Sequence, residues 1–151
     1  MPRYINIDHV KFILHEVLNV KQLCAFERYM DYDAESFNML LSSAKDYSDK
    51  HLFPLFRELD QQAAHYKDGE IIVHPLIGKF MKDAGSIGFI GTSFDYDHGG
   101  MQLPVVMANA LAHIYETAHN HVTGYTGLTG GSAHLIINFG NQELIDQYVP
   151  K

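Results

Sequence analysis

The chain has little of several residue types, and each shortage excludes a class of protein. Its 151 residues include a single cysteine, Cys24, which excludes an intramolecular disulfide and a cysteine-based zinc site. Only 11 lysines and arginines stand against 18 aspartates and glutamates, so the net charge is −7. Nucleic-acid binding depends on clustered positive charge, and we therefore expect no nucleic-acid partner.

Long apolar runs are also missing. No stretch approaches the ~20 apolar residues of a membrane-spanning helix. The N-terminal residues MPRYINIDHVKF lack the apolar segment of a secretory signal. We expect a cytoplasmic protein without a membrane span. With 46% apolar and 12% aromatic residues, a chain of this length should fold as about one domain.

Helical periodicity recurs along the first third of the chain. Residues 8–20 predict an amphipathic helix with Asp8 as its N-cap, and 21–32 a partly helical connector. A stronger pattern begins at the N-cap Asp33 and predicts a helix to about His51. These elements divide the chain into an N-terminal helical extension over 1–32 and a main helical domain over 33–151.

The pattern changes in the middle of the chain. Pro54 predicts a kink, after which the helix resumes towards Asp60. Residues 61–74 hold an Asp-Gly turn and three β-branched residues, which predict a short extended piece. We expect no sheet, because no second strand-like run is present to pair with it. Pro75 then begins another helix that Gly85 ends.

A glycine-rich connector over 85–104 joins two apolar helical segments. It is too apolar for a freely solvated loop, so we expect it to run over or through the core. The following 103–117 are apolar almost all round, which predicts a central helix. Residues 118–131 are rich in small and turn-forming residues, and helices follow over 132–139 and 141–149. The expected fold is an all-α bundle of about six helices.

Histidine is the first candidate for chemistry, because the chain has ten. A helical metal pair needs ligands at i and i+3 or i+4, and no predicted helix contains one. His119 and His121 have no third ligand beside them in the sequence. We therefore expect no metal site, and histidines hydrogen-bonded at helix ends and surfaces.

Other catalytic patterns are absent as well. The run Gly130-Gly131-Ser132 lacks the nucleophile elbow of serine hydrolases, and the glycines of 85–91 follow no strand, as a dinucleotide loop would. Asp95 and Asp97 are expected to be solvated loop carboxylates. We predict no catalytic residue and no self-contained active site, and the residues alone leave the function open.

Three groups of residues resemble, in order, the N-terminal helical domain of the flavin-dependent acyl-CoA dehydrogenases. They are LFPL at 52–55 followed by Asp60, GSIG at 85–88 with DYDHGGMQLP at 95–104, and FGNQE at 139–143 with YVPK at 148–151. The resemblance covers essentially the whole chain. FILHEVL at 12–18 and GYTGLT at 124–129 are similar to the larger bacterial members, which include methylmercaptopropionyl-CoA dehydrogenases.

The chain departs from the family pattern at three places. His98 stands where the family has a tyrosine, Gln102 stands where it has a glycine, and a glutamate is missing around His113. These changes put local contacts in doubt and not the fold.

The resemblance implies an oxidoreductase that removes the α-proton of an acyl-CoA thioester while the β-hydride passes to FAD. It places this chain in fatty acid metabolism, with an electron-transfer flavoprotein as partner and a homo-oligomer as assembly. The family's β-domain and C-terminal helical domain, which carries the catalytic glutamate, are not in this sequence. We therefore expect the chain to hold no FAD and to be inactive alone, and its exposed apolar surfaces to self-associate.

The resemblance also implies that the segment after the central helix lines the acyl-chain cavity. The residues concerned are Val122, Thr123, Gly124, Tyr125 and Leu128. Ordinary packing at a helix junction is the alternative for each of them. For the whole chain, the alternative is a stand-alone all-α protein-interaction module without catalytic activity.

Overall fold

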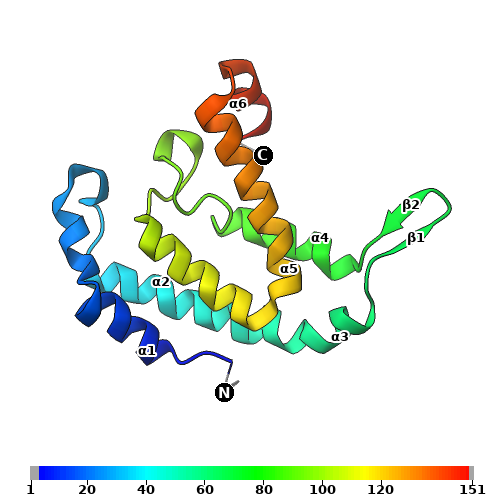
Figure 1. Ribbon diagram of the computed structural model, residues 1–151, viewed down its shortest axis with the longest axis horizontal. Helices are drawn as coiled ribbons and strands as arrows, with labels where there is room; N and C mark the ends of the chain where they lie inside the picture. The colour runs from blue at the N-terminus through cyan, green and yellow to red at the C-terminus, as the bar shows by residue number, and fades with distance from the viewer. Residues whose placement is uncertain (1–3, 150–151) are drawn as a thin grey trace.

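Helices dominate the computed structural model, which describes residues 4–149 (Figure 1). Pro150 and Lys151, which end the last family-like motif, lie outside the described residues. The described part contains six α-helices, which confirms the all-α prediction: α1 Ile7–Phe12, α2 Ala34–Tyr47, α3 Phe56–Gln61, α4 Pro75–Ser86, α5 Val105–Phe139 and α6 Gln142–Tyr148.

The first helix begins earlier than its sequence pattern predicted. Its N-cap is Asn6, whose side-chain oxygen accepts hydrogen bonds from the backbone N–H groups of Asp8 and His9. The prediction of Asp8 as the N-cap was therefore wrong. Asp8 lies in the first turn, where the positive end of the helix dipole stabilises its negative charge. The helix continues as a π-helical turn, Ile13–Val17, and two 3₁₀ helices, Val20–Ala25 and Glu27–Tyr29, form the predicted connector.

The second helix begins where the sequence predicted. Asp33 accepts a hydrogen bond from the Ser36 N–H at 2.7 Å, and the Ser36 hydroxyl accepts one from the Asp33 N–H at 2.8 Å. This reciprocal capping box supplies partners for two backbone donors that the helix cannot satisfy itself. The helix runs into a π-helical turn, Ser48–Leu52, and the short 3₁₀ turn Phe53–Leu55 marks the predicted kink at Pro54.

A β-hairpin stands where the sequence predicted no sheet. Strand β1, His65–Lys67, pairs antiparallel with β2, Glu70–Ile72, and Tyr66 lies opposite Ile71. Asp68 and Gly69 both have positive φ, 51° and 91°, as a two-residue type I′ turn requires. The prediction failed because β1 is polar and exposed, so it has no apolar signature. Figure 1 shows the hairpin projecting from the helices.

The last long helix, α5, is kinked at His119, close to where the sequence predicted the central helix to end (Figure 1). Residues 118–131 belong to α5, and only His119 has non-helical angles, with φ −163° and ψ 78°. Threonine hydroxyls along this stretch bond back to backbone carbonyls one turn earlier, as Thr129 does to Tyr125 at 2.9 Å. The irregular backbone is thus confined to His119, and the residues after it are helical despite their turn-forming composition. Gly140 and Asn141 separate α5 from α6 as predicted, and Asn141 caps α6.

The core lies around the first half of α5, which confirms the prediction of a central helix. Met107 and Ile114 are fully buried there, against Phe37 and Leu41 of α2 and Leu52 of the following π-helical turn. These elements pack side by side along their lengths (Figure 1).

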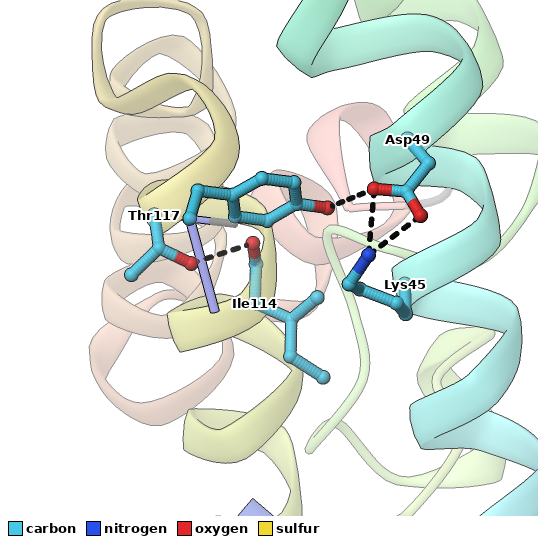
Figure 2. Close-up of polar contacts among 5 residues, drawn as sticks. Lys45, Asp49, Ile114 and Thr117 are labelled. Atoms are coloured by element: carbon cyan, nitrogen blue, oxygen red, sulfur yellow. Dashed lines mark hydrogen bonds and ion pairs between the residues drawn. The ribbon is translucent and has the colours of Figure 1, made fainter. Parts of the chain in front are cut away.

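Side-chain hydrogen bonds form within these packed helices. Lys45 donates to both carboxylate oxygens of Asp49, at 2.7 Å and 2.5 Å, and the Thr117 hydroxyl donates to the Ile114 carbonyl at 3.0 Å (Figure 2). Tyr4 also donates to Asp49, at 2.9 Å. Desolvation alone would raise the pKa of Asp49, but these hydrogen bonds outweigh it and hold the pKa below its usual range.

No helix in residues 4–149 is both long and apolar enough to cross a membrane.

Candidate functional site

A cavity of about 480 Å³ lies between the connector and both parts of α5. This volume falls in the range of about 300–1,000 Å³ that small-molecule sites occupy. The connector supplies one wall with Phe89, Ile90, Thr92, Ser93 and Phe94. The opposite wall is the α5 face that carries Ala108, Leu111, Ala112, Thr123, Thr126, Gly127, Gly130, Gly131 and His134.

Backbone hydrogen bonds fold the connector wall into a fixed shape. Leu103 N–H donates to the Thr92 carbonyl at 2.9 Å, and Gln102 N–H donates to the Phe94 carbonyl at 2.8 Å. A Cβ at Gly100 would lie 2.1 Å from the Phe94 carbonyl oxygen, so only glycine fits this crossing. Residues 91–94 and 101–103 therefore form one bonded unit.

Glycines on the α5 wall leave space in the cavity. An added Cβ at Gly127 or Gly131 would meet no heavy atom within 4 Å, so both leave open space. Gly130 lies against the connector, where an added Cβ would be 3.3 Å from the Ile90 carbonyl oxygen. At the far end of this wall, the Phe94 and His134 rings stack with centroids 5.9 Å apart.

The cavity suits an apolar, uncharged group. No lysine or arginine of the described residues lines it. The polar side chains among its lining residues are Thr92, Ser93, Asn109, Glu116, Thr123, Thr126 and His134. A diphosphate would meet the Glu116 carboxylate without a cation to pair with. The residues present therefore do not fit the diphosphate of FAD, whereas they fit a chain of methylene groups.

The structure distributes the five predicted substrate residues over two faces of α5. Thr123 lines the cavity, and its hydroxyl donates to the Asn120 carbonyl at 3.1 Å. Val122 is buried beside it in the core, and Tyr125 is half-buried. Gly124 and Leu128 lie on the exposed face, where the Leu128 side chain is 78% exposed. Of the five, only Thr123 is among the residues that line the cavity.

His119 contradicts the expectation that the histidines lie at surfaces and helix ends. It is 1% exposed at the irregular turn of α5, and its ring lies 5.3 Å from the Phe56 ring. Within the described residues, neither ring nitrogen has a hydrogen-bond partner. Burial lowers the pKa of His119, because the charged imidazolium loses its hydration, and nearby His121 lowers it further.

One of the two connector carboxylates differs from the prediction. Asp95 forms an ion pair with Arg28, so it is not simply solvated, whereas Asp97 is exposed. Arg28 is 67 residues away in the sequence, and no local pattern could have indicated this contact. Among residues 4–149, no group of three or more histidine, cysteine, aspartate or glutamate side chains could hold a metal ion.

Residues 34–151 match the family model described as acyl-CoA dehydrogenase, N-terminal domain. No curated protein matches the chain significantly.

Proposed function

Because this chain belongs to the acyl-CoA dehydrogenase family through its N-terminal domain, we propose that it is part of a flavoprotein that α,β-dehydrogenates acyl-CoA thioesters. Its own role is to shape the cavity for the acyl chain. The observation that carries this role is the apolar cavity between the connector and α5. Residues 1–32 form an extension to the domain over 33–151.

Several properties of the cavity support an acyl chain as its occupant. It is lined mainly by apolar side chains and glycines, and it lacks the cationic groups that would bind a phosphate. An extended apolar chain would gain roughly 0.8 kcal/mol for each methylene group buried there. We assign Thr123 to the cavity wall. The other four predicted residues, Val122, Gly124, Tyr125 and Leu128, flank it on the same helical segment and do not line the cavity.

The remaining assignments follow from the family. FAD and the catalytic base are proposed to belong to further domains of the parent protein, so this chain alone is inactive. When bound, FAD would accept the hydride from the substrate. An electron-transfer flavoprotein is the proposed partner, and the larger bacterial subtype, similar to methylmercaptopropionyl-CoA dehydrogenases, is the proposed subgroup. Exposed apolar residues such as Phe139, 82% exposed, support assembly into a homo-oligomer.

Filling the cavity tests the proposal. In the protein as purified from its native source, Gly127→Leu places a side chain in the open space of the cavity wall. We expect kcat/KM for long acyl-CoA substrates to fall about tenfold relative to short ones, because lost cavity volume excludes terminal methylenes. Gly78→Leu is the matched control, since Gly78 is an exposed helical glycine whose added Cβ also meets nothing within 4 Å.

The results for short and long substrates distinguish a failure of the cavity assignment from a failure of the proposed activity. Equal losses for short and long substrates in Gly127→Leu would contradict the cavity as the acyl-chain site. A wild-type protein that oxidises no acyl-CoA would contradict the activity itself.

A further inference from the structure

Residues 28–32 are bound to the connector by four side-chain contacts. Arg28 forms its ion pair with Asp95, and the Tyr32 hydroxyl donates to the Met101 carbonyl. In the opposite direction, the Gln102 amide donates to the Arg28 carbonyl at 2.8 Å, and the Tyr96 hydroxyl donates to Asp31 at 3.3 Å. We call these residues, 28–32, the clasp. They precede the residues that match the family, 34–151.

The contacts reach the part of the connector that is bonded to the cavity wall. Met101 N–H donates to the Gly91 carbonyl at 3.1 Å, and the Met101 carbonyl accepts from the clasp. The Gln102 backbone N–H donates a hydrogen bond to the Phe94 carbonyl, and the Gln102 side-chain amide donates one to the Arg28 carbonyl in the clasp. Thr92, Ser93 and Phe94, which line the cavity, are thus fixed through a short bonded path.

The clasp is itself anchored to the core. The Tyr32 ring stacks on the Phe37 ring with centroids 5.6 Å apart and planes at 22°, and Phe37 is fully buried in α2. Asp33, the next residue, caps α2. The clasp therefore has a rigid support, and its hydroxyl and guanidinium are held towards the connector.

The backbone of the connector at Gln102 requires stabilising contacts from outside the connector. Gln102 has a positive φ of 53°, a conformation that costs about 1 kcal/mol or more for a residue with a side chain and persists only when its surroundings enforce it. The Gln102 side chain and the Met101 carbonyl beside it are two of the groups that contact the clasp.

We propose that residues 28–32 are positioning residues that hold the connector wall against α5 and so set which acyl chains the cavity accepts. This role rests on the proposed function, whereas the mechanical link does not. Without the clasp, residues 91–94 move more freely and the cavity discriminates less sharply between chain lengths.

Hydrogen exchange tests the link directly. In Tyr32→Phe, the ring still stacks on Phe37 but the Met101 carbonyl loses its donor. We expect the amides of Phe94, Met101, Gln102 and Leu103 to exchange about fivefold faster, the factor expected for one lost hydrogen bond. The amides of α2 and the first half of α5 should not change. Tyr66→Phe, in the exposed hairpin, is the matched control with 71% exposure of Tyr66.

A charge reversal gives a second, independent test. Arg28→Asp should accelerate exchange at the same connector amides, and adding Asp95→Arg should restore the wild-type rates. Lys79→Asp is the control, because Lys79 forms an exposed ion pair with Asp83 on α4, away from the connector. A purely local loss of stability would not be rescued by the swapped pair.

Activity completes the test. In the native protein, Tyr32→Phe should change the ratio of kcat/KM between long and short acyl-CoA about fivefold, mainly through KM. Unchanged connector exchange would overturn the clasp, and faster exchange with an unchanged ratio would overturn its role in specificity. Wild-type protein inactive on every acyl-CoA would overturn the proposed function and this specificity role, while exchange would still decide the mechanical link.

Discussion

The two halves of α5 use apolar residues in opposite ways, although they belong to one helix. Before His119, the apolar side chains mainly pack in the core, where Met107 and Ile114 are fully buried, although Ala108 and Leu111 also line the cavity. After His119, one face borders the cavity and the other exposes Leu128 and Phe139, at 78% and 82%. The first half thus contributes mainly to the core, whereas the second half carries more of the apolar side chains that are left exposed.

The largest expected difference between the two halves is in the stability lost when one apolar side chain is truncated in each. Ile114→Ala should lower the free energy of unfolding by about 4 kcal/mol, because it leaves a cavity in the packed core. Leu128→Ala should change it by less than about 0.5 kcal/mol, since Leu128 is exposed. Urea denaturation monitored by circular dichroism measures both. Similar losses in the two variants would contradict the division of the helix.

A smaller effect is expected from the ion pair on the helices that pack against the first half. Asp49→Asn should cost about 2 kcal/mol at pH 7, because Lys45, with 12% side-chain exposure, loses its charged acceptor. The folded-state pKa of Asp49 is lowered, so its stabilisation is present above its unfolded-state pKa and is lost as the pH falls through the folded-state value.

The exposed carboxylate of α4 is the control for this variant. Asp83→Asn removes an ion pair whose lysine is 63% exposed, and it should cost less than about 0.5 kcal/mol. Chemical denaturation at pH 7 and at pH 3 distinguishes the two. Equal costs at both pH values for Asp49→Asn would contradict the pairing.

The smallest effect is expected at the residue between the two halves. His119→Leu should raise the free energy of unfolding by about 1 kcal/mol at pH 7, since a buried imidazole without a partner in the described residues is replaced by an apolar group. The folded-state pKa of His119 is lowered, so the unfolded chain binds a proton first as the pH falls. Wild-type stability should therefore begin to fall near the unfolded-state pKa, about 6.5, and His119→Leu should lose that part of the pH dependence.

Thermal unfolding between pH 7.5 and pH 5 follows this difference. His65→Leu, in the exposed hairpin, serves as the control and should leave the pH dependence unchanged. A variant at His119 that retains the full wild-type pH dependence would assign the acid sensitivity to other groups.

Local signals in the sequence predicted the elements whose causes are themselves local. The cap at Asp33, the kink at Pro54 and the break at Gly140 each depend on neighbouring residues, and the structure confirms them. The continuous apolar pattern over 103–117 likewise predicted the central helix. The hairpin was missed because strand β1 carries polar, exposed residues, so the Asp68-Gly69 turn and the β-branched residues of β2 had no recognisable partner strand.

The candidate site was harder to predict because its contacts are not local. Residues 118–131 have the composition of a turn, yet apart from His119 they are helical, and three of their glycines line the cavity. The resemblance to the family indicated Thr123, but no pattern indicated the facing wall at Thr92 and Phe94. The clasp was invisible for the same reason, since Tyr32 contacts a carbonyl 69 residues away.

The most direct test of the central assignment is the visible absorbance spectrum of the protein purified from its native source, recorded before and after adding acyl-CoA. The account predicts a flavin spectrum that bleaches as substrate is oxidised, with bleaching that depends on acyl-chain length and shifts in Gly127→Leu. A colourless protein, or a flavin spectrum that no acyl-CoA changes, would contradict it.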